Sequence, residues 1–303
     1  MDLAPIVIFV YKRLNHTKLT IDSLLQCEES KYTTVYIYSD APRSTQDVNA
    51  VIEVRDYLKT ISGFKQVIIF QRETNYGLAK NIISGLNEIF EKNEKAIILE
   101  DDIIVSKHFL KFMNDSLSVY LKEKNVWHIS GWNYPIIYPN YQHNSYFLQL
   151  SNCWGWATWA DRWKHFEKKP DYIMQTWSSE MKKNFTLNNA NYNFWKQVTY
   201  NKKNKINTWA IFWYATIFQN NGLCLNPVKT FTKNIGNDGT GENCGDIDIY
   251  NSDLNVDYDN NFPKSIQIDT IFYKLISQFY LQNKTPFYLR VIKRVKIIFN
   301  NIK

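Results

Sequence analysis

The chain has 303 residues, of which 45% are hydrophobic and 16% aromatic, and its formal net charge is +7. This length can build one large or two modest domains, and the composition is that of a globular protein. The positive charge suits a nucleic acid, an anionic membrane surface or a phosphorylated substrate as partner. The apolar run after Asp2 is too short for a signal peptide, and no stretch approaches the length of a membrane span. We therefore expect a soluble, cytoplasmic protein.

The four cysteines are scattered, and no CxxC pair occurs. This spacing predicts neither a zinc site nor a disulfide framework. We expect free, buried thiols at Cys27, Cys153, Cys224 and Cys244.

The first hundred residues alternate between strand and helix patterns. Strands are expected over 5–10, 34–39 and 67–70. The helices between them carry Leu19, Leu24 and Leu25; Val48, Ile52 and Leu58; and Leu78, Ile82, Leu86 and Ile89. Such a βαβαβαβ order predicts an α/β fold with an open, mostly parallel sheet, in which ligands bind beyond the carboxyl ends of the strands.

The segment 95–106, KAIILEDDIIVS, is the most informative stretch of the sequence. Its first half predicts a strand buried on both faces that ends in Glu100, Asp101 and Asp102. Three adjacent unneutralised carboxylates would repel each other and cost desolvation energy, so this pattern favours a site for a hard divalent cation. The alternative is a solvated acidic turn between two strands.

Other polar residues follow the predicted strands at the same edge. Tyr11, Lys12 and Arg13 follow the first strand, and Asp40 follows the second. Asp40 could accept a hydrogen bond from a base or ribose, and Arg13 could face phosphate. No Walker-type glycine loop and no GxGxxG follows the first strand, which argues against a P-loop enzyme or a Rossmann dehydrogenase. Singly, Arg13 and Asp40 could be ordinary surface residues.

Seven segments occur in an order that resembles a known family. They are PIVIFVYKR, Asp40, NYGLAKN at 75–81, LEDD at 99–102, WHISGWN at 127–133, WGWATW at 154–159, and NTWAIFW followed by NPVKTFTKNIGNDGTG. Together they resemble GT-A-fold glycosyltransferases, in particular the inverting N-acetylglucosaminyltransferases of the N-glycan-branching type and their bacterial polysaccharide-building relatives.

The resemblance implies a role for each donor-side residue. Asp102 would be the direct ligand of Mn²⁺ or Mg²⁺, Asp101 would reach the ribose or the waters of the metal, and Glu100 would bond hydroxyls of the donor sugar. Asp40 would lie by the base, and Tyr11, Arg13 and Lys80 would belong to the nucleotide-sugar site. A divalent cation with basic neighbours stabilises a departing nucleoside diphosphate as a Lewis acid.

The acceptor site is expected in the tryptophan-rich middle of the chain. Six tryptophans fall between 127 and 163, and about half are expected in the core. We expect Trp132, Trp154 and Trp156 at the acceptor site, with Gly155 allowing a ligand close to the backbone. The lysine-rich region 164–205 is expected to form exposed helices and loops with a solvated face.

Ala210 departs from the pattern of the resembled family. An inverting transferase needs a general base, and in the relatives an Asp commonly follows the Trp aligned with Trp209. Three explanations are open. The chain could be an engineered inactive variant, which we favour; the base could come from Asp161, Asp238 or Glu242; or the alignment could be out of register.

The last two segments carry further expectations. Residues 234–245 hold four glycines and predict a mobile loop, which in the resembled family folds over the donor. We expect a catalytic domain over 1–262, with a nucleotide-sugar half (1–105) and an acceptor half (106–262), and helices over 263–303. Residues 286–303 contain five basic residues and no acid, which predicts a membrane-surface helix. The alternative is a helix docked on the catalytic domain.

Taken together, the sequence predicts a metal-dependent inverting glycosyltransferase on the inner face of the cytoplasmic membrane. It would move a sugar from a nucleotide donor, UDP above others, to a lipid-linked surface glycan such as capsule, O-antigen or lipooligosaccharide, with no nucleic-acid partner. Two rivals remain: a sugar nucleotidyltransferase, and a non-catalytic nucleotide-sugar or glycan-binding protein of transferase ancestry.

Overall fold

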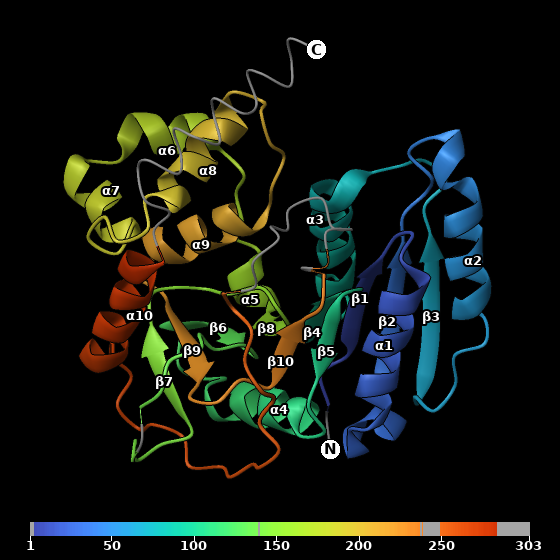
Figure 1. The fold of residues 1–303 in the computed structure, drawn as a ribbon, viewed down its shortest axis with the longest axis horizontal. Coiled ribbons are helices and arrows are strands. Elements are labelled where there is room, and N and C mark those ends of the chain that lie inside the picture. Colours follow the sequence, from blue (N-terminus) through green and yellow to red (C-terminus); the bar gives the residue numbers. More distant parts are fainter. Residues whose placement is uncertain (1–2, 139, 237, 239–248, 284–303) are drawn as a thin grey trace.

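The structure is a computed structural model that describes residues 3–138, 140–236, 238 and 249–283. Within these ranges the chain forms an eight-stranded sheet with helices on both faces and a separate two-stranded sheet (Figure 1). The larger sheet contains β1 (Ile6–Val10), β2 (Thr34–Ser39), β3 (Gln66–Gln71), β4 (Lys95–Glu100), β6 (Val126–Ser130), β7 (Ser145–Leu148), β8 (Trp156–Trp159) and β9 (Leu223–Pro227). The smaller sheet pairs β5 (Ile103–Val105) with β10 (Thr232–Asn234) in antiparallel register.

The strand order of the larger sheet is β3-β2-β1-β4-β8-β6-β9-β7. The first four strands in this order are mutually parallel. β8 enters antiparallel between β4 and β6, and β7 is antiparallel to β9 at the far edge. The predicted α/β class with a mostly parallel sheet is confirmed.

The helices connect and cover these strands. They are α1 (Leu14–Leu25), α2 (Val48–Leu58), α3 (Gly77–Phe90), α4 (Phe109–Val119), α5 (Ala160–Trp163), α6 (Pro170–Thr176), α7 (Ser179–Phe185), α8 (Asn193–Lys202), α9 (Ala210–Gln219) and α10 (Thr270–Gln282). The alternating elements predicted for the first hundred residues are confirmed. The face predicted for α2 is wrong: Val48 and Ile52 are exposed, and Val51 and Val54 are buried instead.

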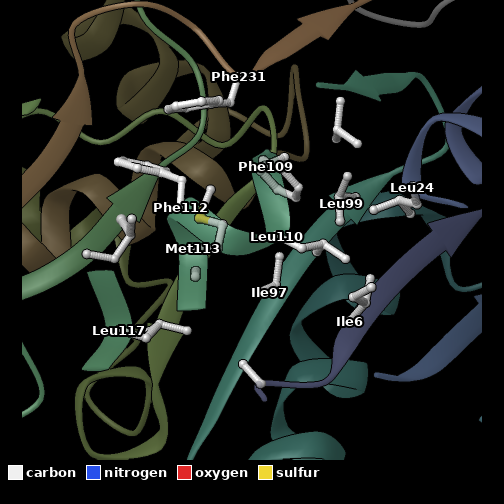
Figure 2. Packing of buried hydrophobic residues seen from close by; sticks show 14 of the residues in the cluster. Ile6, Leu24, Ile97, Leu99, Phe109, Leu110, Phe112, Met113, Leu117 and Phe231 are labelled. Atoms are coloured by element: carbon white, nitrogen blue, oxygen red, sulfur yellow. The ribbon is translucent and has the colours of Figure 1, made fainter. Parts of the chain in front are cut away.

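β1 and β4 are buried on both faces because helices cover each side of the sheet. Ile6 and Ile8 contribute to a core that also contains residues of α1, α2 and α4. Val7 and Phe9 alternate with them and join the core formed with α3 and α9. Figure 2 shows the first core, in which Phe109, Phe112 and Met113 of α4 pack near Ile97 and Leu99 of β4. The acidic segment therefore begins at the end of a rigid strand.

α10 packs into a third core that lies under the second half of the chain. Phe272 of α10 stacks on Tyr146 of β7, with ring centroids 3.6 Å apart and planes 6° apart. Phe272 and Ile276 are both 1% exposed. The apolar face of α10, within the predicted C-terminal helical segment 263–303, is therefore buried against the rest of the protein. The predicted basic helix over 286–303 lies outside the described residues.

Two further predictions concern membrane-spanning segments and the cysteine thiols. In the described ranges, no helix combines the length and apolar character needed to cross a bilayer. Cys27 and Cys224 are buried free thiols as predicted, and Cys153 is a half-buried free thiol. Cys244 lies outside the described residues.

Candidate active site

The acidic segment at the end of β4 lies against the residues that follow β1. Parallel pairing places Phe9 of β1 opposite Glu100 of β4, so both strands end at the same edge. Arg13, directly before α1, donates from Nη2 to Asp101 and also to Asp102 Oδ2 at 2.8 Å. The Tyr11 backbone N–H donates to Asp101 Oδ2 at 3.4 Å. The structure thus brings together the acidic segment, Tyr11 and Arg13.

One guanidinium faces three carboxyl groups in a buried setting. Asp101 and Asp102 are 5% and 7% exposed. Burial, and then the charges of Asp102 and Asp101, raise the pKa of Glu100 to about 8. Burial also raises the pKa of Asp101, against the opposing effect of Arg13. For Arg13, burial acts to lower the pKa, but the two aspartates outweigh it and raise the pKa. The single positive charge of Arg13 does not balance the carboxyl groups around it, so a bound cation would stabilise their charged forms.

Two atoms of this cluster have no hydrogen-bond partner in the described part of the chain. Arg13 Nη1 is buried and unpaired, and the Asp102 carboxylate accepts through Oδ2, which leaves Oδ1 without a donor. A buried donor without an acceptor is costly, and such atoms in proteins call for an explanation such as a bound ligand. Arg13 Nη1 suits an anionic oxygen, and Asp102 Oδ1 suits a cation.

Gly236 closes over the same cluster and was missed by sequence reasoning. The Ile235 N–H donates to the Asp102 carbonyl at 2.9 Å, which continues the β5–β10 pairing. A Cβ at Gly236 would lie 2.2 Å from Asp102 Oδ2 and 3.0 Å from Arg13 Nη1. Only glycine lets the backbone approach this closely. The glycine in NIGNDGTG was the available signal.

The predicted metal ligand can be compared with the donors that are present. In the described ranges, no group of three or more His, Cys, Asp and Glu side chains could hold a metal ion. Mg²⁺ and similar cations are commonly held by one or two carboxylates, with phosphate oxygens and waters as the remaining ligands. Asp102 Oδ1 fits that kind of site. The residues therefore fit a cation shared with a phosphate ligand, and not an all-protein cage.

Asp40 has a structural role that the sequence did not reveal. Its carboxylate accepts from the backbone N–H groups of Tyr76 and Gly77, both at 2.8 Å, at the start of α3. It also accepts from the Ala41 N–H at 2.9 Å and from Asn75 Nδ2 at 3.3 Å. A carboxylate has about four acceptor sites. The prediction that Asp40 bonds a base is therefore not supported, because its acceptor sites are engaged in holding α3.

Tyr11 and Lys80 lie at the borders of the candidate site. The Tyr11 hydroxyl donates to Asp47 Oδ2 and accepts from the Arg43 N–H, both at 2.9 Å. Tyr11 thus fixes the loop that follows β2. Lys80 is exposed, and its Nζ lies 4.0 Å from the centre of the Tyr76 ring. Its predicted contact with the diphosphate stays a prediction.

The tryptophans predicted at the acceptor site divide into core and surface residues. Trp132 and Trp156 are 2% and 1% exposed. Trp156 packs among Trp163, Trp209 and Trp213. Both are core residues, which corrects their assignment as acceptor contacts. Trp154 is half-buried and stays available as a wall of the site.

Gly155 is required for packing and not for ligand approach. Its φ is 72°, in the left-handed region, and a Cβ there would lie 2.7 Å from Thr232 Cγ2. The Thr232 hydroxyl donates to the Trp154 carbonyl at 2.6 Å. The glycine therefore lets β10 pack on the turn before β8, which corrects the sequence interpretation.

Ala210 is the first residue of α9, next to the sheet. Trp209 stacks on Trp156 with centroids 5.5 Å apart, and Trp156 pairs with Ile98, two residues before Glu100. Ala210 itself packs against the core that contains Trp156 and Trp213. An alanine side chain here cannot accept a proton.

The three alternative candidates for the general base lie in different parts of the chain. Asp161 follows β8, whose antiparallel register sets Trp159 opposite Lys95, at the amino end of β4. It bonds Lys124 at 2.7 Å and Arg162. Glu100 is five residues further along β4 than Lys95, or about 17 Å at ~3.3 Å per residue. Asp161 thus lies toward the edge of the sheet opposite the acidic segment, and its role as a base stays a prediction. Asp238 lies 3.2 Å from His16 Nε2, and Glu242 lies outside the described residues.

Comparisons with known proteins bear on this region. A family model described as glycosyltransferase family 25 (LPS biosynthesis protein) matches residues 85–153, which include the acidic segment. No curated protein sequence matches the chain. Among solved structures, TarS of S. aureus is similar with a TM-score of 0.30 and 17% identity, over 47% of this chain and 24% of TarS. The matched region thus spans about a quarter of TarS.

Proposed function

We propose that this chain is a metal-dependent, inverting glycosyltransferase that uses a UDP-sugar donor and extends a lipid-linked bacterial surface glycan. The observation that carries the proposal is the buried Arg13 guanidinium, which bridges Asp101 and Asp102 and keeps Nη1 without a partner in the described chain. The family 25 match over the same segment supports a glycosyltransferase acting in LPS biosynthesis.

The donor half assigns a task to each residue. Asp102 Oδ1 would hold Mn²⁺ or Mg²⁺ together with the diphosphate, and the bound cation supplies Lewis-acid stabilisation of the leaving group. Arg13 Nη1 donates to a diphosphate oxygen, which satisfies the buried donor. The Glu100 carboxyl group makes no side-chain hydrogen bond in the described chain and can bond a hydroxyl of the donor sugar.

The transfer step requires a proton acceptor as well. The acceptor hydroxyl oxygen bonds to the anomeric carbon of the donor, the bond from that carbon to the diphosphate breaks, and the hydroxyl proton leaves to a base. Ala210 stands where the resembled family has that base. An Asp introduced at this position, the first residue of α9, would supply the proton acceptor that the proposed reaction requires.

A second candidate follows from Ala210 itself. A nucleotide-sugar or glycan-binding protein that has lost turnover needs the donor half and no base. Both candidates predict that the chain binds the nucleotide-sugar donor. Only the glycosyltransferase predicts that sugar transfer appears when an Asp is introduced at position 210.

The donor claim is tested by thermal shift with a panel of nucleotide sugars, with and without Mn²⁺. A ligand that binds only the folded state raises its stability by about 2.7 kcal/mol at a concentration 100 times its Kd. We expect UDP and one or more UDP-sugars to raise Tm only when Mn²⁺ is present. A panel with no UDP-dependent shift would overturn the proposal.

A further inference from the structure

One of the strongly basic regions of the chain lies in its middle. Residues 164–205 contain nine lysines, three acids and no arginine, which gives this region a net charge of +6. They follow α5 and include the helices α6, α7 and α8. Figure 1 shows these three helices gathered beside α9, away from β1–β3. We call residues 164–205 the lysine lobe.

α8 shows how the lysines are presented. Its inner face carries Trp195 and Val198, which are buried. Positions 192, 196, 200 and 203 recur at spacings of four, four and three, so they form one stripe along the other side of the helix. Lys196 and Lys203 on this stripe are exposed, and Tyr192 is 57% exposed. We call these four residues with Lys205 the α8 stripe.

The charges of the α8 stripe are not neutralised by neighbours. The Lys196 and Lys205 ammonium groups both lie over the Tyr200 ring, 5.1 Å and 5.5 Å from its centre. Elsewhere in the lobe Lys169 pairs with Glu167 at 2.8 Å, and Lys202 pairs with Asp171. In the described part of the chain, Lys196, Lys203 and Lys205 make no ion pair with an acid. Two ammonium groups are thus held together over the half-buried Tyr200 ring, and the exposed Lys203 lies on the same stripe.

The lysine lobe is joined to the acceptor side of the candidate site. Asn201 of α8 accepts from the Thr208 N–H at 3.0 Å and donates to the Thr208 hydroxyl at 2.8 Å. Lys168 donates to Asn207. Residues 207 and 208 lead directly into Ala210 at the start of α9. α8 is therefore tied, through its buried Asn201, to the segment that leads to Ala210, while the α8 stripe faces away from that contact.

We propose that the α8 stripe docks this protein on an anionic lipid surface. A fluid negative surface attracts clustered lysines at about 1 kcal/mol each, and tyrosines favour the polar–apolar boundary of a bilayer. The absence of arginine disfavours a nucleic acid, whose phosphates and bases arginine reads with its planar fork. This site is distinct from the basic segment 286–303. It extends the proposed function, because a lipid-linked acceptor is presented at such a surface.

The test is co-sedimentation of the full chain with vesicles, with no donor present. Neutral phosphatidylcholine vesicles are compared with vesicles containing one quarter phosphatidylglycerol, at ~0.1 M salt, where charges act over about 10 Å. The variant K196Q/K203Q/K205Q is compared with K65Q/K92Q/K122Q, which removes the same charge from exposed lysines outside the lobe. Each stripe lysine is worth about fivefold in affinity, so we expect the stripe variant to bind on the order of 100-fold more weakly.

The outcomes decide the proposal. The expected result is binding to anionic vesicles only, weakened by the stripe variant and little changed by the control variant. Equal weakening in both variants, no effect of the stripe variant, or no binding by the unaltered chain would each overturn it. A double-stranded 20-mer DNA that binds as tightly and loses affinity equally in the stripe variant would also overturn it. The UDP thermal shift of the stripe variant is measured separately, so failure of the docking surface and failure of donor binding are distinguishable.

Discussion

Arg13 Nη2 lies 2.8 Å from Asp102 Oδ2 and also bonds Asp101, so one guanidinium ties α1 to two buried aspartates. Its side chain is 20% exposed, and those of the aspartates are 7% and 10% exposed. Removing one member of a buried ionic group leaves the other charges without compensation, and this costs more than the pair itself contributes. The same guanidinium therefore serves both folding and the proposed donor site.

Replacing Arg13 with Gln tests this double role. We expect the free energy of unfolding, measured by urea denaturation without divalent cations, to fall by about 3 kcal/mol. Mn²⁺ should restore part of the loss, because it supplies the missing positive charge. Asp101→Asn in the Arg13→Gln background should recover stability. A loss below about 0.5 kcal/mol, the range of ordinary surface changes, would contradict the role of Arg13.

His128 predicts how stability depends on pH. It is fully buried in β6, its Nδ1 accepts from Trp213 Nε1 at 3.2 Å, and its Nε2–H donates to the Asn152 carbonyl at 2.9 Å. Burial lowers its pKa to about 3 from 6.5. Between these values the unfolded state binds more protons, so the contribution of His128 is complete above pH 6.5 and is lost as pH falls.

The change that isolates this effect is His128→Gln. From pH 6.5 to 5, the unaltered chain should lose about 2 kcal/mol through His128, at about 1.36 kcal/mol per pH unit. The variant should be less stable at pH 7 but lack this part of the slope, as measured by urea denaturation at both pH values. Parallel slopes in the two proteins would show that His128 is not held neutral.

The contact between α10 and β7 predicts that α10 belongs to the folded domain. Phe272 stacks on Tyr146 and is 1% exposed. Phe272→Ala should lower the free energy of unfolding by about 3–5 kcal/mol, the usual cost of deleting a buried aromatic side chain. Ile271→Ala is the control, because Ile271 is 40% exposed on the same helix. Similar losses in both variants would contradict the docking of α10.

Much of the donor side could be predicted from sequence because local pattern and topology agree there. The apolar run before Glu100 predicts a buried strand, and parallel order then sends the residues after β1 to the same edge. The sequence predictions that differ from the structure depend on long-range packing. The antiparallel insertion of β8, which carries Asp161 to the opposite edge, depends on pairing between distant segments. Sequence also cannot separate a core Trp156 from a half-buried Trp154 two residues away.

Ala210→Asp tests the missing base. If the position serves the reaction, transfer from the UDP-sugar identified by thermal shift should rise by 10²–10⁴-fold, the usual contribution of a general base. The product is measured by release of UDP in the presence of a glycan acceptor. Asn207→Asp, three residues earlier and outside α9, is the control. No gain over this control would remove the engineered-variant explanation and favour a binding protein.

The central claim is that Asp102 and Arg13 bind a cation and a diphosphate together. Calorimetric titration of UDP into the protein with and without Mn²⁺ measures this directly, with Asp102→Asn as the test and Asp161→Asn, at the opposite edge of the sheet, as the control. The account predicts Mn²⁺-dependent UDP binding that Asp102→Asn weakens at least about tenfold, a difference of about 1.4 kcal/mol, and that Asp161→Asn leaves unchanged. UDP binding of equal strength without Mn²⁺, or in Asp102→Asn, would contradict it.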